Sequence, residues 1–261
     1  MSNQNIETAA KRLREAAQKK QPCAPVRDLI GETDLEKAYA VQSLNTAWRK
    51  ARGGRVVGSK IGLTSPAVQK QLGVSQPDFG MLWGDTEVSN NGEISARAIM
   101  QPKVEAEIAF VLGKDLPDPS LTTTDVLSAI EYALASIEIV GSRIENWDIR
   151  ITDTIADNAS ASHFVVGHKP VRLENLDLIH AKMCLYKNGE KASEGRGDQC
   201  MGSPLNAMLW LAKTLAKLGT PMKAGDLILT GALGPMVPVA AGDAFEARIE
   251  GLGGVFVRFT D

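Results

Sequence analysis

The sequence has little of several features that mark common classes of protein. It contains only three cysteines, Cys23, Cys184 and Cys200, whose wide spacing matches no metal site, so we expect reduced thiols. No apolar run approaches the roughly 18 residues that a transmembrane helix needs, and the polar first 20 residues lack the apolar core of a secretory signal. These absences predict a cytoplasmic protein that does not enter a membrane.

An excess of basic charge is also missing. The 29 lysines and arginines are balanced by 31 aspartates and glutamates, which gives a formal net charge of -2. Binding to nucleic acid needs a basic surface that neutralises phosphates, so we predict no nucleic-acid partner. The sequence also lacks a P-loop, a GxGxxG motif and a GxSxG motif, which argues against nucleotide binding and against a serine-hydrolase elbow.

What is present is ordinary globular composition, with 44% hydrophobic residues, in two sections of different texture. Amphipathic helices are predicted over residues 5–20 and from Thr33 to about residue 52, where Thr33 and Glu36 match a capping box. Beyond them, short apolar strand patterns alternate with glycine turns. We therefore predict an α+β fold with a helical N-terminal section, residues 1–52, and a β-rich domain, residues 53–261.

Within the β-rich domain, further helices are predicted over residues 65–73, 123–136 and 203–219. A hairpin is expected at Asn188-Gly189, because this dipeptide suits a type I′ turn. The polar run at residues 151–162 is predicted to be a loop, which either supplies hydroxyl and amide groups to a site or is simply solvated.

Three glutamates stand in apolar strand patterns. Glu105 and Glu107 lie two residues apart, so their carboxylates share one face of a strand, about 7 Å apart. Glu138 belongs to a second apolar pattern. Buried glutamates need a counter-charge, and all-oxygen ligands favour Mg²⁺ or Mn²⁺. The alternative is that Glu105 and Glu107 line a solvated sheet face while Glu138 pairs with Arg143.

Two further charged residues are candidates for a site. Lys60 lies in an apolar strand pattern next to Gly62, and we expect it to bind a substrate carboxylate, assisted by backbone donors at the helix start near Ser65. The alternative is a surface lysine on an edge strand. Asp78 is either an acid/base group or a turn residue.

These residues stand in longer blocks that resemble a known family. The blocks are VVGSKIGLTSPAVQKQLGVSQPDFGML, QPKVEAEIAFVL, IEIVGSRIENW, DTIADNAS, GRGDQCMGSPLNA and LTGALGPMV. They resemble the 2-hydroxypenta-2,4-dienoate (2-oxopent-4-enoate) hydratases of the fumarylacetoacetate hydrolase superfamily. The resemblance implies a mixed β-sheet roll with a smaller helical N-terminal part, assembled as a homo-oligomer.

The resemblance also implies the site. It assigns the metal, Mg²⁺ or Mn²⁺, to Glu105, Glu107 and Glu138. It implies catalytic roles for Lys60, Asp78 and Ser160, and substrate binding by Lys60, Leu63, Ser160 and Thr230.

The implied reaction is metal-dependent addition of water to 2-hydroxypenta-2,4-dienoate, giving 4-hydroxy-2-oxopentanoate during meta-cleavage degradation of aromatic compounds. One alternative is 4-oxalocrotonate decarboxylase, although KIGL and TGALGPM favour the hydratase. Another is a hydratase of a longer 2-oxo-enedioate, which an extra cation in the pocket would mark. A non-catalytic subunit is disfavoured by the intact glutamates. A complex with a decarboxylase or a downstream aldolase is also expected.

Overall fold

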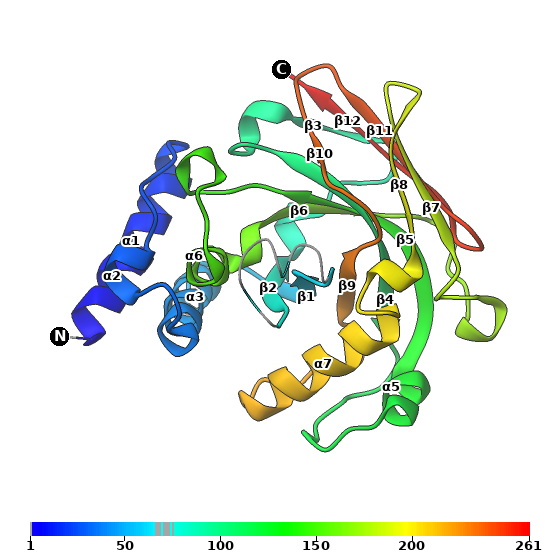
Figure 1. Ribbon diagram of the computed structural model, residues 1–261, viewed down its shortest axis with the longest axis horizontal. Helices are drawn as coiled ribbons and strands as arrows, with labels where there is room; N and C mark the ends of the chain where they lie inside the picture. The colour runs from blue at the N-terminus through cyan, green and yellow to red at the C-terminus, as the bar shows by residue number, and fades with distance from the viewer. Residues whose placement is uncertain (1, 66–68, 70–73, 75) are drawn as a thin grey trace.

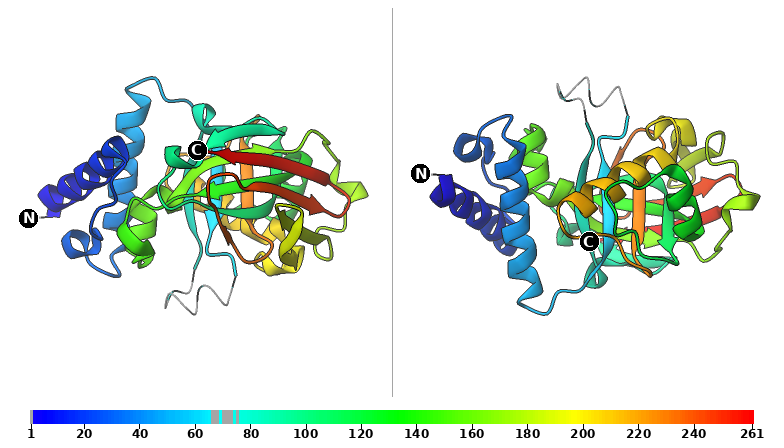
Figure 2. Two further views of the ribbon diagram at one scale, coloured as in Figure 1. Left: turned by 90° about the horizontal axis from the view of Figure 1, so that it is seen from above. Right: turned by 90° about the horizontal axis from the view of Figure 1, so that it is seen from below.

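The computed structural model describes residues 2–65, 69, 74 and 76–261 (Figure 1). Its helices are α1 (Ser2–Lys19), α2 (Arg27–Ile30), α3 (Leu35–Lys50), α5 (Thr123–Ala129), α6 (Ile151–Ala156) and α7 (Pro204–Lys217). Helices α1 to α3 lie at one end of the molecule, and the strands, with α5 and α7 beside them, lie at the other (Figure 2). The helix predicted over residues 65–73 lies largely outside the described residues.

The described strands form two sheets. The larger has the order β2-β1-β9-β4-β5-β6, with β10 also paired to β4, and the smaller has the order β3-β12-β11-β7-β8. Their bounds are β1 Val56–Gly62, β2 Asp78–Trp83, β3 Gly92–Ser95, β4 Lys103–Leu112, β5 Ile130–Val140, β6 Ala161–Val166, β7 Lys182–Lys187, β8 Glu190–Arg196, β9 Leu227–Ala232, β10 Val237–Pro238, β11 Ala244–Ile249 and β12 Gly253–Thr260.

The main hydrophobic core lies between the two sheets and beneath α7. Ile108 and Ile137 of the larger sheet belong to the same buried cluster as Phe245 and Val257 of the smaller one. The predicted mixed-sheet α+β fold is therefore confirmed. Strand β4 lies between β9 and β5, which pair with both of its edges, and most of its residues are buried, so that Glu107 is buried and Glu105 half-buried.

A second buried cluster joins the N-terminal helices to α6. Val41 of α3 packs in this cluster with Ile151 and Ile155 of α6. Gln42 of α3 is also buried, and its Nε2 donates to the carbonyls of Phe79 and Ile155. The helical section thus shares its core with the segment that follows β5, and the predicted boundary at residue 52 stays a prediction.

The predicted capping box at the start of α3 is wrong. Asp34, not Thr33, is the N-cap: its side chain accepts a hydrogen bond from the Lys37 backbone N–H at 3.1 Å. The Lys37 ammonium also lies 2.7 Å from the Asp34 carboxylate. A carboxylate next to the first turn satisfies a free N–H and interacts favourably with the helix dipole, and this outweighs the Thr-x-x-Glu pattern.

Two predicted elements are wrong in part. The helix over residues 123–136 ends at Ala129, where β5 begins, because β5 pairs with β4 on one side and β6 on the other. The predicted loop at residues 151–162 contains α6, all of whose residues are buried. Asp153 organises it: its carboxylate accepts backbone N–H groups of Arg150 and Val26. A short segment of mixed apolar and polar residues has no clear period, so its sequence does not distinguish helix from strand or loop. The elements that it packs against in the folded protein decide which one forms.

Other predicted elements are confirmed. Helix α7 begins at Pro204 with Ser203 as its N-cap. The β7–β8 hairpin turns at Asn188 and Gly189, whose φ angles of 54° and 85° are those of a type I′ turn. None of the helices that the structure describes combines the length and the apolar character needed to cross a membrane.

Candidate active site

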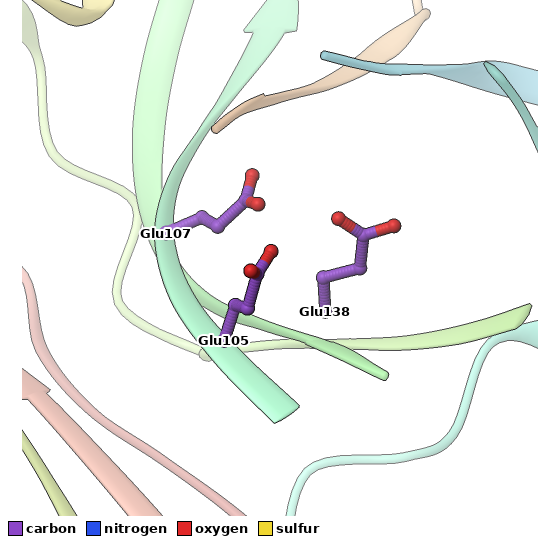
Figure 3. Close-up of side chains that lie close together, drawn as sticks. All are labelled: Glu105, Glu107 and Glu138. Carbon is purple, nitrogen blue, oxygen red and sulfur yellow. The ribbon is translucent and has the colours of Figure 1, made fainter. Parts of the chain in front are cut away.

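Three glutamate side chains from neighbouring strands turn toward one space (Figure 3). Glu105 of β4 lies directly opposite Glu138 of β5 in the strand register, and Glu107 is two residues further along β4. One carboxylate oxygen from each lies within 4.8 Å of the others. Glu107 and Glu138 are fully buried. The period of two that the sequence indicated therefore places Glu105 and Glu107 on one face, and the pairing of β4 with β5 adds Glu138.

The carboxylates have too few partners of their own. Glu107 Oε2 accepts the Gly231 N–H at 2.8 Å, but Glu107 Oε1 and Glu138 Oε1 have no hydrogen-bond partner among the described residues. Burial, and then the adjacent Glu138 carboxylate, raises the pKa of Glu105 to about 7. Burial also raises the pKa of Glu107 and Glu138. An all-oxygen set of unsatisfied, crowded carboxylates fits a hard divalent cation.

Lys60 is the buried cation beside this cluster. It is only 3% exposed, so the alternative of a surface lysine is wrong. Its Nζ lies 3.1 Å from Glu138 Oε2 and donates to the Ala159 carbonyl at 3.0 Å. Burial alone would lower the pKa of Lys60, but Glu138 and the other nearby carboxylates outweigh it and raise the pKa. Lys60 therefore carries a positive charge at neutral pH.

The alternative pairing of Glu138 with Arg143 is also wrong. The Arg143 guanidinium forms an ion pair with Asp157 and donates to its backbone carbonyl. Arg143 thus fixes the segment that follows α6 and leaves Glu138 to the buried site.

Asp78 lies on β2, opposite Gly62 of β1. Its Oδ2 accepts a hydrogen bond from the Thr154 hydroxyl at 3.2 Å, while Oδ1 has no partner among the described residues. Burial raises the pKa of Asp78 although the Lys60 charge opposes this. A Cβ atom on Gly62 would lie 2.3 Å from Asp78 Oδ1 and 3.4 Å from Lys60 Nζ. Glycine is therefore needed here for both side chains to fit.

A left-handed turn closes the site on the other side. Asn158, Ala159 and Ser160 have φ angles of 57°, 51° and 56°, a run that is unfavourable for residues with a Cβ. The Asn158 side chain holds it by donating to the Met81 carbonyl and accepting from the Met81 N–H, at 3.0 and 2.8 Å. The turn points the Ala159 carbonyl at Lys60 and brings the Ser160 hydroxyl 3.5 Å from that of Thr154.

These groups border one cavity of about 340 Å³. Its lining includes the predicted residues Lys60, Leu63, Asp78, Glu105 and Ser160. Glu107 and Glu138 lie deeper, behind Glu105. The structure thus brings all but one of the predicted site residues together, and their roles in catalysis and binding stay predictions.

Thr230 is the exception. Its hydroxyl donates to the Ile108 carbonyl at 2.8 Å, and it is not among the described residues that border the cavity. The next residue, Gly231, is the one that binds Glu107. Gly231 has a φ of 114°, and a Cβ there would lie 2.4 Å from Thr64 Oγ1. Sequence reasoning chose Thr230, but the residue that contacts Glu107 is Gly231. A glycine directly after the threonine was the sequence feature that could have pointed to it.

The mouth of the cavity has a cation that the sequence did not reveal. Lys103 and Trp147 both border it, and Lys103 Nζ lies 4.2 Å from the centre of the Trp147 ring. Burial lowers the pKa of Lys103, and the Glu105 carboxylate partly opposes this. Ile149 and Met236 make the rest of this edge apolar.

Comparison with known proteins places the chain in a family. The sequence model of the fumarylacetoacetate (FAA) hydrolase C-terminal region matches residues 55–260. The chain belongs to the fumarylacetoacetate hydrolase family. Within this family it is 56% identical over 254 residues to the TodF product hydratase of Pseudomonas putida, covering 97% of this chain and 95% of that one. It is 52% identical over 262 residues to a 2-keto-4-pentenoate hydratase of Paraburkholderia phymatum, with 100% of both chains covered.

A solved structure agrees with the fold over its whole length. The 4-oxalocrotonate decarboxylase of Pseudomonas putida G7, complexed with magnesium and adipate, superposes with a TM-score of 0.94 at 35% identity. The match covers 99% of this chain and 98% of that one. In this family member a divalent cation is bound, and the carboxylate cluster of the present chain has the chemistry to hold one.

Proposed function

We propose that this protein is a divalent-metal-dependent hydratase that adds water to 2-hydroxypenta-2,4-dienoate and releases 4-hydroxy-2-oxopentanoate. The observation that carries the proposal is the carboxylate cluster of Glu105, Glu107 and Glu138, which lies beside Lys60 at the cavity that Lys60, Asp78 and Glu105 line. Full-length relatives named 2-keto-4-pentenoate hydratase favour this reaction over others in the family.

The three glutamates would hold Mg²⁺ or Mn²⁺. When bound, the cation supplies Lewis acidity to the C1 carboxylate and C2 oxygen of a 2-hydroxydienoate. Lys60 remains charged beside Glu138 and offers a donor to the substrate carboxylate. These groups would hold the carboxylate end of the substrate in the cavity that Asp78, Thr154 and Ser160 also line.

The reaction needs two proton transfers and one water. A proton added at C5, with loss of the proton from the C2 hydroxyl, gives the conjugated 2-oxo-3-enoate. Water then adds its oxygen at C4 and gives up a proton, while C3 gains one, so that the net change is the addition of one water. Asp78 suits the proton transfers because burial raises its pKa and its Oδ1 has no partner among the described residues. The hydroxyls of Thr154 and Ser160 lie at the same wall and would orient the water.

A product assay tests the proposal. Purified protein with Mg²⁺ is given freshly generated 2-hydroxypenta-2,4-dienoate in one NMR tube and 2-oxohex-3-enedioate in another. We expect 4-hydroxy-2-oxopentanoate in the first tube only, and none after chelation. Release of carbon dioxide from the second tube, without hydration in the first, would replace the hydratase with a decarboxylase.

One observation favours a second candidate, an enzyme acting on a longer dioic acid. Lys103 borders the cavity and is the cation that a second carboxylate would meet. Lys103→Met separates the two candidates. For the pentadienoate hydratase the variant keeps its turnover of the five-carbon substrate, whereas an enzyme for dioic acids would lose turnover of its substrate.

The assembly of the protein is proposed from the family resemblance. We propose a homo-oligomer in the cytoplasm, which associates with a decarboxylase or with a downstream aldolase. Light scattering on the purified protein measures the first association, and co-purification with each enzyme measures the second. A monomer at micromolar concentration would contradict the homo-oligomer.

A further inference from the structure

A second cavity, of about 430 Å³, lies between the N-terminal helices and the edge of the larger sheet. Its walls come from α1, α3, the end of β2 and the segment after α6, which Figures 1 and 2 show at the helical end of the molecule. We call this cavity the arginine pocket, since four arginines line it: Arg14, Arg49, Arg52 and Arg143. None of them belongs to the active site described above.

The arginine pocket has more positive than negative charge. Arg49 lies 2.7 Å from Asp85, and Arg143 is paired with Asp157. Arg14 donates to the neutral Asn45 side chain at 2.7 Å, and Arg52 has no acidic partner among the described residues. Two guanidinium charges therefore remain unbalanced in a partly enclosed space. A ligand with two negative charges would neutralise them.

The two unbalanced guanidinium groups are arranged around one aromatic ring. The Arg52 Cζ lies 4.1 Å and the Arg14 Cζ 5.7 Å from the centre of the Trp48 ring. Packing on a ring reduces the freedom that an arginine loses on binding and leaves N–H donors at the edge of the guanidinium for a ligand, although Arg14 Nη1 would give up its bond to Asn45 to take part. Each such edge matches a carboxylate in a two-pronged contact. Two separate edges match two separate carboxylates better than a single compact anion.

We propose that the arginine pocket binds a small dicarboxylate, at a site separate from the catalytic cavity. The two sites are back to back: Asp157 and Asn158 face the arginine pocket, while Ala159 and Ser160 border the active site. A test must therefore distinguish binding at the two cavities, because a dicarboxylate can also approach the metal site.

Calorimetric titration of the Mg²⁺-loaded protein with succinate, at low salt, provides the test. We expect one binding event that persists in Glu107→Gln, which alters the metal site. Arg52→Gln and Arg14→Gln should each weaken this event by about tenfold, the usual effect of losing one charge-assisted contact. Arg172→Gln, an exposed arginine that lines neither cavity, is the matched control and should bind as the parent does.

Inorganic phosphate is the second probe. We expect it to bind more weakly than succinate, because one compact anion cannot reach both guanidinium edges as well. The proposal is overturned if succinate binding is unchanged in both arginine variants, if it disappears in Glu107→Gln, if phosphate binds more tightly than succinate, or if no binding occurs. Thermal unfolding of each variant verifies that it is folded.

Discussion

The active-site cavity and the arginine pocket lie on opposite sides of residues 157–160 and carry opposite excess charge. Counted as formal charges, four carboxylates face two lysines in the active site, an excess of two negative charges, whereas the arginine pocket has two positive charges in excess. Burial raises the pKa of all four carboxyl groups, which lowers this negative charge while no cation is bound. The two sites differ even more in how deeply their charged groups are buried than in the sign of their charge. Glu107 and Glu138 are fully buried with unpaired oxygens, whereas Arg52 is exposed to water. The buried carboxylates therefore depend on a bound cation to offset their charge, whereas water can solvate the exposed arginine when no ligand is bound.

Removing one buried carboxylate should give the largest effect. Glu107→Gln keeps the size of the side chain but loses the charge, so we expect kcat/KM to fall by about a thousandfold, equivalent to roughly 4 kcal/mol. Steady-state kinetics with the pentadienoate measures this. Glu131→Gln, an exposed glutamate on β5, is the matched control and should leave kcat/KM unchanged. Equal activity of the two variants would show that the buried carboxylate at Glu107 is not required for turnover.

Displacing Asp78 without removing it should have the next largest effect. The methyl group of Gly62→Ala would lie against Asp78 Oδ1, so we expect kcat to fall by about a hundredfold, the usual cost of moving a reacting group by about 1 Å. Gly254→Ala is the control, because its Cβ would have only ordinary contacts at 3.7 Å. If Gly62→Ala is as active as Gly254→Ala, Asp78 does not take part in the chemistry.

Removal of the metal should lower stability. A ligand present at a hundred times its Kd stabilises the folded state by about 2.7 kcal/mol, so chelation should lower the melting temperature by roughly 5–10 °C. Differential scanning fluorimetry with and without chelator measures the change. In Glu107→Gln the difference should shrink, because the variant binds the ion weakly. A chelator effect of the same size in both proteins would show that the stabilising ion binds elsewhere.

Part of the carboxylate cluster could be predicted from the sequence because that part of the signal is local. Glu105 and Glu107 share a face through the strand period alone, and their apolar neighbours indicate burial. The turn at Asn158 is different, since its left-handed backbone depends on hydrogen bonds to Met81, which is distant in the sequence. Residues 130–136 also have a pattern that suits a helix, but pairing with β4 on one side and β6 on the other makes them a strand.

The arginine pocket was beyond sequence reasoning for the same reason. Arg14 and Arg52 lie at opposite ends of the helical section, and Arg143 follows β5. Only the packing of α1 against α3, and of α3 against α6, brings these charges to one cavity. Where several distant segments each contribute one residue, no spacing in the sequence records the site. The same holds for Lys103 and Trp147 at the mouth of the active site.

The smallest predicted effect concerns His163, near the arginine pocket. Burial, with Arg49 nearby, lowers the pKa of His163 to about 4. The unfolded chain therefore binds this proton more readily, and His163 should destabilise the fold by about 2 kcal/mol when the pH falls from 7 to 5. Urea unfolding at both pH values, for the parent and for His163→Gln, isolates the contribution. An identical loss of stability in the two proteins would show that His163 does not titrate as described.

The most direct test of the central claim is to count bound Mn²⁺ and measure turnover in the same samples. Metal-free protein is titrated with Mn²⁺, and free ion is followed by electron paramagnetic resonance while 4-hydroxy-2-oxopentanoate is quantified. The account predicts one tightly bound Mn²⁺ per chain, turnover that rises in proportion to it, and loss of both in Glu107→Gln. Full turnover with no bound ion, or tight binding unaffected by Glu107→Gln, would contradict it.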